Sequence, residues 1–293
     1  MSKIEDIKSY IESILPQAHF DSVSVGIVDF KSSTYETISL GFEGKLFFDI
    51  ASMTKPFTFG VACLEIESQL TDEMKLLLHH NSGLPRWGRL DKKSWREQIL
   101  SYQISKSETM YSDFGALRLQ LEIEKLTGKH LYDISSKYWD NEEVKHWLDL
   151  EGERCAFTGR RNRHVIHGEV HDDNAFVLAE KVSHAGLFAT IDGVCRTLLS
   201  LNSKLDLLKR VGIDHVGRYV KGFDSVENIE STLAGQHSSK NTFGHLGFTG
   251  TSMWMDPEKE LGCILLTNEV NGVWYDRQVL NNVRRKVGTI SFS

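Results

Sequence analysis

Residues 48–55 read Phe48-Asp49-Ile50-Ala51-Ser52-Met53-Thr54-Lys55, an S-x-x-K pattern that follows an apolar, strand-like segment. A helix that begins at Ser52 places the serine hydroxyl and the Lys55 amine side by side, because positions i and i+3 share one helix face. A serine hydroxyl needs a neighbouring base to act as a nucleophile. Lysine becomes such a base when burial and nearby positive charge lower its pKa. The helix N-terminus adds backbone N–H groups where an oxyanion would form.

Both residues also have ordinary structural interpretations. Ser52 fits the N-cap of a helix, and Lys55 fits a solvated surface charge. An S-x-x-K pattern is short enough to occur by chance. Whether Ser52 and Lys55 are a catalytic pair or two unrelated residues therefore depends on the motifs found elsewhere in the chain.

Hydrophobic periodicity outlines the secondary structure on both sides of this segment. Apolar residues at helical spacing (Ile4, Ile7, Ile11 and Leu15) predict an amphipathic helix from about residue 3 to 15, ended by Pro16. Alternating β-branched residues predict a hairpin of strands at 23–29 and 34–42, and further strands at 243–256 and 261–268. Helices are expected at 54–68, 72–80, 94–104, 114–127, 131–138, 192–202 and 275–287.

Strands therefore lie at both ends of the sequence and helices in the middle. This order predicts an α/β (α+β) fold in which the two ends form one antiparallel sheet flanked by the terminal helices. We expect a sheet domain made of residues 1–55 plus 240–293, and a mostly helical inserted domain made of residues 56–239. A cleft between two such domains is the usual place for a functional site.

The charge balance argues against a nucleic-acid partner. The net charge is -6 and the isoelectric point is about 6.1, so the chain has no overall basic character. A local basic cluster at Arg160, Arg161 and Arg163 has acidic flanks and is interpreted as solvated surface charge. The sequence does not predict an oligomeric state.

The N-terminus and the cysteines bear on the compartment. Residues 1–8 mix charged and apolar side chains and lack the apolar core of a signal peptide, and no stretch reaches a transmembrane length. None of the four cysteines forms a C-x-x-C pair, so a disulfide framework is not expected. We therefore expect a cytoplasmic protein, or a periplasmic one if a leader has been trimmed.

Three further segments contain candidate residues for a functional site. Residues 76–85 (LLLHHNSGLP) are a helix end that runs into a Gly-Pro turn. Residues 111–115 (YSDFG) open a helix, with Ser112 and Asp113 as candidate N-caps. Residues 243–251 (FGHLGFTGT) form a strand-like segment with several glycines, and glycine in a strand permits close approach of a ligand or another backbone.

In this order and at these separations, the segments resemble the class C β-lactamase family of serine hydrolases, which includes penicillin-binding carboxypeptidases and related esterases. Ser52 and Lys55 match its S-x-x-K, Tyr111 and Asp113 its Y-x-N, and residues 245–247 (HLG) its K-T-G. Residues 78–85 are similar to the family's L-x-H-x-S-G-L-P. Two more segments, 167–175 and 184–190, resemble a carboxypeptidase-like branch. The resemblance extends from about residue 20 to the C-terminal helix and implies a β-lactamase/transpeptidase-like fold.

The resemblance implies acyl transfer through a covalent intermediate. Ser52 would attack a carbonyl, while Lys55 and Tyr111 share the proton transfers; which of the two is the base stays open. The N–H groups of Ser52 and Phe248 would form the oxyanion hole. His245 would polarise the tyrosine and the substrate, and the substrate-binding positions are Asp113, Leu246, Gly247 and Phe248. No cofactor is implied.

Three departures from the family pattern are informative. Asp113 replaces a neutral asparagine, and its carboxylate can pair with Lys55 and keep the amine protonated. His245 replaces a lysine, so positive charge there would depend on pH. Leu246 replaces a threonine that helps to bind a substrate carboxylate in related enzymes. These changes favour less anionic esters or amides over β-lactams and D-alanyl peptides.

A metal site is the main competing interpretation of one region. Histidines and acids gather there (His164, His167, His171, Asp172 and Asp173), and imidazole with carboxylate suits zinc. Their spacing matches no rigid two-ligand helix motif, however, so we expect no metal.

The sequence thus predicts a serine hydrolase that acts through an acyl-enzyme on a small ester or amide. A D-Ala-D-Ala carboxypeptidase or penicillin-binding protein with a peptidoglycan-type substrate is one alternative. A catalytically silent relative that binds a ligand or partner is the other, because Asp113 and Leu246 depart from the pattern.

Overall fold

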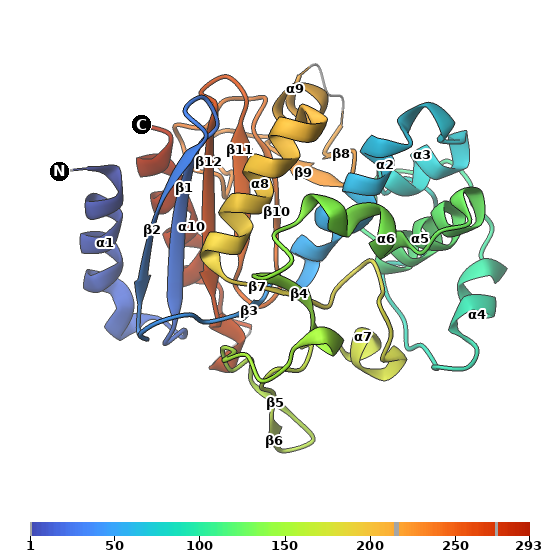
Figure 1. The fold of residues 1–293 in the computed structure, drawn as a ribbon, viewed down its shortest axis with the longest axis horizontal. Coiled ribbons are helices and arrows are strands. Elements are labelled where there is room, and N and C mark those ends of the chain that lie inside the picture. Colours follow the sequence, from blue (N-terminus) through green and yellow to red (C-terminus); the bar gives the residue numbers. More distant parts are fainter. Residues whose placement is uncertain (1, 214–216, 273–274) are drawn as a thin grey trace.

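The computed structural model describes residues 2–213, 217–272 and 275–293. A seven-stranded antiparallel sheet is the main sheet of this fold. Its strand order within these residues is β2-β1-β12-β11-β10-β9-β8 (Figure 1). The strands are β1 (Val23–Asp29), β2 (Thr34–Leu40), β8 (Tyr219–Val220), β9 (Phe223–Ser225), β10 (Phe243–Leu246), β11 (Ser252–Asp256) and β12 (Leu261–Thr267).

The two ends of the chain meet as neighbouring strands of this sheet, as the sequence predicts. β1 pairs antiparallel with β12, with Val23 opposite Thr267 and Asp29 opposite Leu261. β1 also pairs with β2 in the predicted hairpin. The β-branched and apolar residues of β1 and β12 are buried because both faces of the sheet are covered by helices.

The terminal helices α1 (Lys3–Ile14) and α10 (Gln278–Ser291) cover one face of the sheet (Figure 1). The predicted apolar stripe of α1 is buried there with the apolar side of α10. Helix α8 (Ile191–Leu205) covers the opposite face. It lies close to β1 at Gly26, where an added Cβ would come within 2.6 Å of Cys195 Sγ, so a small residue is needed at this crossing.

A mostly helical part lies beside the sheet (Figure 1). Its helices are α2 (Val61–Glu65), α3 (Asp72–Leu78), α4 (Trp95–Ser101), α5 (Asp113–Thr127), α6 (Leu131–Ser135) and α7 (Asp173–Leu178). A small sheet in the order β3-β7-β4 joins Phe48–Asp49, Leu187–Ala189 and Val144–His146, and β5 (Arg160–Arg161) pairs with β6 (His164–Val165) in a projecting hairpin.

The sheet extends beyond the expected boundary at residue 240. β8 and β9 pair next to β10, and α8 packs on β1, although all three lie within residues 56–239. α9 (Leu207–Gly212) follows α8 and contacts β11. Short strands of two or three residues give no periodic signal in a sequence, which is why this part of the sheet was not predicted. We propose that the inserted helical domain ends near residue 186 rather than 239.

The segment 243–256 is not one strand. A turn at residues 247–251 separates β10 from β11, and Gly247 N donates to Thr251 O at 2.8 Å across its base. Of the glycines predicted to lie in this strand, Gly244 does so in β10, whereas Gly247 and Gly250 lie in the turn.

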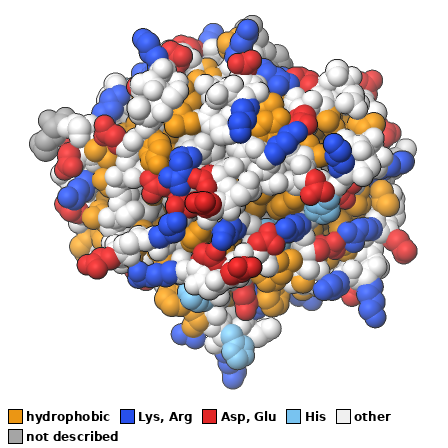
Figure 2. Space-filling view, in the orientation of Figure 1, with side chains coloured by type: hydrophobic (Ala, Val, Ile, Leu, Met, Phe, Trp, Pro, Cys, Tyr) orange, Lys and Arg blue, Asp and Glu red, His pale blue; other side chains and the backbone are white. Residues whose placement is uncertain are grey.

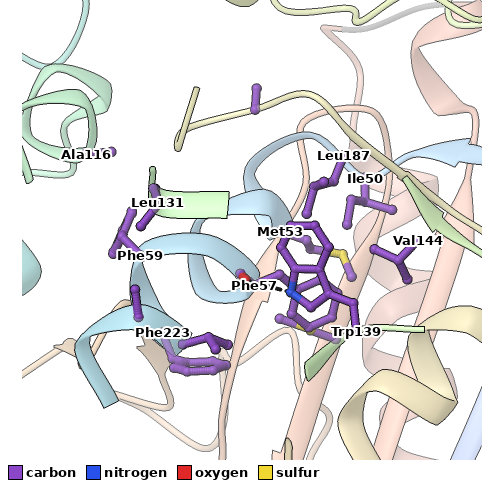
Figure 3. Close-up of a cluster of buried hydrophobic side chains, with 14 of the residues drawn as sticks. Ile50, Met53, Phe57, Phe59, Ala116, Leu131, Trp139, Val144, Leu187 and Phe223 are labelled. Carbon is purple, nitrogen blue, oxygen red and sulfur yellow. Dashed lines mark hydrogen bonds between the residues drawn. The ribbon is translucent and has the colours of Figure 1, made fainter. Parts of the chain in front are cut away.

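The helical segment after β3 is anchored in the main hydrophobic core (Figure 3). Met53 and Phe57 are fully buried against Trp139, whose Nε1 donates to Phe57 O at 2.8 Å. A π-helical turn, Pro56–Gly60, follows directly, and such turns are frequent at functional sites. The packing therefore holds Ser52 and Lys55 on a rigid base.

None of the helices in the described part of the chain has the length and apolar content needed to cross a bilayer. Its four cysteines are free thiols, all buried.

Candidate active site

Ser52 lies at a sharp turn between β3 and the helical segment that follows. Ala51 has a φ of 46°, in the left-handed region that residues with a side chain seldom adopt. Asp49 stabilises this turn, because its Oδ1 accepts a hydrogen bond from Ala51 N at 2.8 Å. Ser52 then lies inside a short 3₁₀ turn, Ala51–Met53, whose N-cap is Ile50, and its hydroxyl accepts a hydrogen bond from Lys55 Nζ. The interpretation of Ser52 as a helix cap is therefore not supported.

The predicted proximity of serine and lysine is present. Lys55 Nζ lies 3.1 Å from Ser52 Oγ and donates to it. It also donates to His184 O at 2.9 Å and forms an ion pair with Asp113 Oδ1 at 2.7 Å. The Lys55 side chain is fully buried, so it is not the solvated charge of the alternative interpretation.

The ion pair decides the charge of Lys55. Burial by itself lowers the pKa of the amine, but the nearby Asp113 carboxylate and Tyr111 hydroxyl outweigh burial and raise the pKa above its ordinary value. Lys55 is therefore an ammonium at neutral pH in the resting protein. The sequence predicted this effect of Asp113.

Tyr111 lies over the same pair. Lys55 Nζ is 4.9 Å from the centroid of the Tyr111 ring. The tyrosine hydroxyl is buried, and it makes no hydrogen bond of standard geometry with any described residue. Burial raises its pKa, against the opposing effect of Lys55, so the phenol is neutral at rest. The ring packs between His80, at 4.8 Å, and His245, at 5.9 Å between centroids.

His245 reaches this cluster from β10 as a neutral imidazole. Burial, followed by repulsion from Lys55, lowers the pKa of His245 to about 3. Its Nδ1 donates to Leu246 O at 2.7 Å, and its Nε2 is buried without a partner among the described residues. The sequence predicted a charge that varies with pH, but burial keeps this side chain neutral above about pH 3.

We expect His245→Gln to leave the pH dependence of the reaction unchanged between pH 5 and 8. The imidazole does not titrate in this range, so no inflection of kcat/KM can come from it. The profiles of the two proteins should run parallel, with the variant lower at every pH. An inflection near pH 6.5 that is present in the wild type and absent from His245→Gln would contradict the neutral imidazole.

Leu246 lies on the other face of the sheet. Successive side chains of a strand point to opposite faces. His245 accordingly faces Tyr111, while Leu246 packs against the core cluster under α1 and α10. Leu246 is not among the residues that line the cleft. Its predicted contact with substrate, and the argument about substrate charge drawn from it, are therefore not supported.

The turn at 247–251 is held against the Ser52 segment by two hydroxyl groups. Thr249 Oγ1 donates to Asp49 O at 2.6 Å, and Thr251 Oγ1 donates to Ile50 O at 3.2 Å. A Cβ at Gly247 would lie 1.9 Å from Thr251 Oγ1 and 2.6 Å from Ile50 O, so only glycine fits there. The two predicted oxyanion donors, the N–H groups of Ser52 and Phe248, thus belong to segments that are bonded to each other.

A cleft of about 1290 Å³ opens above these groups. Ser52, Tyr111, Asp113 and Phe248 line it, whereas Lys55, His245 and Gly247 lie behind this surface. The β5–β6 hairpin forms part of its wall, with Arg160 and Arg161. Figure 2 shows acidic and basic side chains interspersed over the face in view, with Arg and His side chains together at the bottom, where this hairpin projects.

Three of the five residues considered as metal ligands, His171, Asp172 and Asp173, bind other groups of the chain. Asp172 pairs with His184 Nε2 at 2.9 Å, and Asp173 with Arg161 Nε at 3.1 Å. His171 Nδ1 donates to Thr158 O at 2.8 Å. Within the described ranges, no three or more His, Cys, Asp or Glu side chains are grouped as metal ligands.

Sequence reasoning missed two buried groups beside the site. The Asp49 carboxylate accepts hydrogen bonds from Ala51 N and, at 2.7 Å, from His171 N. Burial raises the pKa of Asp49 to about 6. Its position directly before the S-x-x-K pattern was the only available signal. Arg284 lies in the helix predicted at 275–287, but no role in the site was predicted for it; it is buried and donates to Gly247 O and Thr251 O. No sequence pattern distinguishes it from its neighbour Arg285.

The fold and this cluster define the class of serine hydrolases that includes β-lactamases and penicillin-binding proteins. The family model described as Beta-lactamase matches residues 73–285, which include Tyr111 and His245 and begin after Lys55. The chain belongs to this family.

Relatives and solved structures agree with this assignment. The chain is 30% identical over 248 residues to an N-acetylmuramyl-L-alanine amidase of Bacillus subtilis, covering 66% of this chain and 55% of the relative. It is 27% identical over 267 residues to a provisionally named D-alanyl-D-alanine carboxypeptidase of Escherichia coli K12, covering 73% and 60%. The chain thus spans little more than half the length of these relatives. A simvastatin synthase variant from Aspergillus terreus shares the fold, with a TM-score of 0.71, 12% identity, and coverage of 99% and 95%.

Proposed function

We propose that this protein hydrolyses a small ester or amide through an acyl-enzyme on Ser52. The observation that carries the proposal is the position of Lys55 Nζ, 3.1 Å from Ser52 Oγ and 2.7 Å from Asp113 Oδ1, under the open cleft. A nucleophile that contacts a base, which is itself oriented by a third group, is the general arrangement of nucleophilic catalysis.

The reaction begins with the release of a proton by Lys55. The resting ammonium cannot accept the Ser52 proton, so the reactive form is the minor one in which the amine has released its proton to the solvent of the cleft. Ser52 Oγ then bonds to the substrate carbonyl carbon while its proton passes to Lys55. The carbonyl electron pair moves onto oxygen, where the N–H groups of Ser52 and Phe248 stabilise the charge.

The intermediate collapses when the leaving group takes a proton from the cluster. Lys55 supplies this proton directly or through the Tyr111 hydroxyl, which lies above it. Water then attacks the acyl group from the cleft, and the same groups remove its proton and return one to Ser52 Oγ. The neutral His245 contributes polarity but no charge to these steps.

The charges of the cleft favour a substrate that carries a carboxylate away from the reacting bond. Among the acidic side chains that line the cleft, Asp113 pairs with the Lys55 ammonium, Asp173 with the Arg161 guanidinium, and Asp172 with the His184 imidazole. Arg89 and Arg160 also line it, and neither forms an ion pair with a described residue. The names of the two curated relatives make a peptidoglycan-type peptide the first candidate for such a substrate.

Charge reversal at Arg89 and Arg160 tests this preference. We expect the Arg89→Glu, Arg160→Glu double variant to raise KM for a carboxylate-bearing peptide about 10-fold at low ionic strength, with a smaller effect at 0.5 M salt. KM for a neutral p-nitrophenyl ester should not change. Arg163→Glu is the matched control, because Arg163 lies on the same hairpin and does not line the cleft. An equal effect on both substrates would contradict a carboxylate subsite.

Intact-mass measurement after incubation with p-nitrophenyl esters and β-lactams tests the proposed function itself. We expect an acyl adduct that peptide mapping places on Ser52. The absence of any adduct across the panel would favour the alternative that the chain is a silent ligand-binding relative. One observation favours that alternative: the Asp113 carboxylate keeps Lys55 in its unreactive, protonated form.

A further inference from the structure

A buried arginine of α10 holds the turn that carries the predicted oxyanion donor. Arg284 is 6% exposed. Its Nη2 donates to Gly247 O at 3.2 Å and to Thr251 O at 2.8 Å, so one nitrogen joins the two ends of the turn. Its Nη1 donates to Asn281 Oδ1 at 3.3 Å, one helical turn earlier on α10. The guanidinium is thus fixed between the helix and the turn.

The first of these contacts acts on one particular peptide group. The carbonyl of Gly247 and the N–H of Phe248 belong to the same peptide unit. All peptide bonds of the described residues are trans, so this N–H points away from the carbonyl oxygen and from Arg284. A hydrogen bond to the carbonyl oxygen fixes the orientation of the peptide plane. It also polarises the amide, which makes its N–H a stronger donor.

We propose that Arg284 is a positioning residue that orients and polarises the Gly247–Phe248 peptide so that Phe248 N–H serves as an oxyanion donor. This inference rests on the proposed acyl-enzyme mechanism. A guanidinium suits the task because it has several N–H donors in one rigid plane: Nη2 donates to both carbonyl oxygens of the turn, while Nη1 donates to Asn281.

Arg284 is still a cation at neutral pH, although its surroundings lower its pKa. Burial, together with repulsion from Arg277, lowers the pKa of Arg284 to about 9, which still leaves a cation at neutral pH. The fully buried carboxylate of Glu269 opposes this effect and balances the charge. Glu269 lies against the same turn, since a Cβ at Gly250 would come within 2.7 Å of Glu269 Cβ.

A second arginine provides an internal comparison. Arg277 Nη1 donates to Phe248 O at 2.7 Å, but that carbonyl shares its peptide unit with the N–H of Thr249, which is not an expected oxyanion donor. Both arginines hold the turn, and only Arg284 acts on the donor peptide.

The test compares Arg284→Met with Arg284→Lys, using Arg285→Met as the matched control. Arg285 follows Arg284 on the same helix, and the bond of its side chain within the described residues is to Ser231 O, at 3.5 Å. Each protein is acylated by a p-nitrophenyl ester and by the corresponding thionoester, and the rate of p-nitrophenol release is followed together with the adduct on Ser52. The thionoester reports on the oxyanion hole, because sulfur is a poorer hydrogen-bond acceptor than oxygen.

We expect Arg284→Met to slow acylation by the oxoester about 10- to 100-fold, since complete loss of an oxyanion donor costs about 10²–10³. The ratio of oxoester to thionoester rates should fall towards one. Arg284→Lys should show the same changes to a smaller extent, and it decides the question if Arg284→Met does not fold. Arg285→Met should match the wild type.

Two results would overturn the role of Arg284 while leaving the proposed function intact. One is a wild-type rate and ratio in both Arg284 variants. The other is a reduced rate with an unchanged ratio, which would assign Arg284 a general structural role. If the wild type formed no acyl-enzyme with either ester, the proposed function and this inference would fail together.

Discussion

Ser52→Ala is expected to lose hydrolytic activity by on the order of 10⁵-fold or more while remaining folded. Removal of the nucleophile abolishes the covalent route, and Lys55 and Asp113 cannot replace it because neither can form an equivalent acyl intermediate. Ser52 is not the N-cap of its turn, which is Ile50, and Lys55 keeps its bonds to His184 O and Asp113 without the serine hydroxyl. The change in the free energy of unfolding should therefore stay within about 1.5 kcal/mol.

Ester hydrolysis and intact mass check this expectation on the same samples. The variant should show neither turnover nor an adduct with any probe that labels the wild type. Ser107→Ala is a suitable control, because Ser107 is exposed and its hydroxyl contacts only Glu108 O. Activity of Ser52→Ala within 10-fold of the wild type would show that the reaction does not pass through this residue.

The parts of the site that follow from local geometry could be predicted from the sequence. Ser52 and Lys55 are three residues apart on a helical segment, so their contact at 3.1 Å depends only on that segment being helical. The pairing of Asp113 with Lys55 followed from charge once the motifs were placed in one cleft. The hairpin of β1 and β2 followed from the alternating, β-branched residues of both segments.

The parts that depend on packing could not be predicted. Leu246 is next to His245 in sequence but lies on the opposite face of the sheet, and the motif alone does not say which of the two faces the cleft. The neutral state of His245 results from burial by segments far away in the sequence. Arg284 is buried only because α10 lies directly behind the turn at 247–251.

Asp113→Asn is expected to raise the acylation rate at pH 7 by about 10-fold or more. The Asp113 carboxylate is the main group that raises the pKa of Lys55, against the effect of burial. An asparagine retains the size of the side chain and removes the charge, so burial then dominates and lowers the pKa of the amine. At fixed pH, the neutral fraction of Lys55 rises about tenfold for each unit by which the pKa of its amine falls. Only this neutral fraction can accept the Ser52 proton.

The sign of the effect is clearest in the dependence of acylation on pH. In the wild type the rate should climb with pH up to the alkaline limit of the assay, because the pKa of Lys55 lies above its ordinary value. In Asp113→Asn the climb should begin at lower pH and reach a plateau. The two profiles should converge at high pH, where Lys55 is neutral in both proteins.

The same substitution should lower stability, because it removes a buried ion pair. Breaking such a pair costs about 3 kcal/mol when the remaining charge stays buried, and less if Lys55 loses its proton. A faster but less stable variant would mean that Asp113 stabilises the fold at the expense of the chemistry. Asp113→Glu is the control that keeps the charge, and it should keep the wild-type pH profile. A lower rate for Asp113→Asn at every pH would instead show that the reaction requires the carboxylate, as the acceptor of the Lys55 proton.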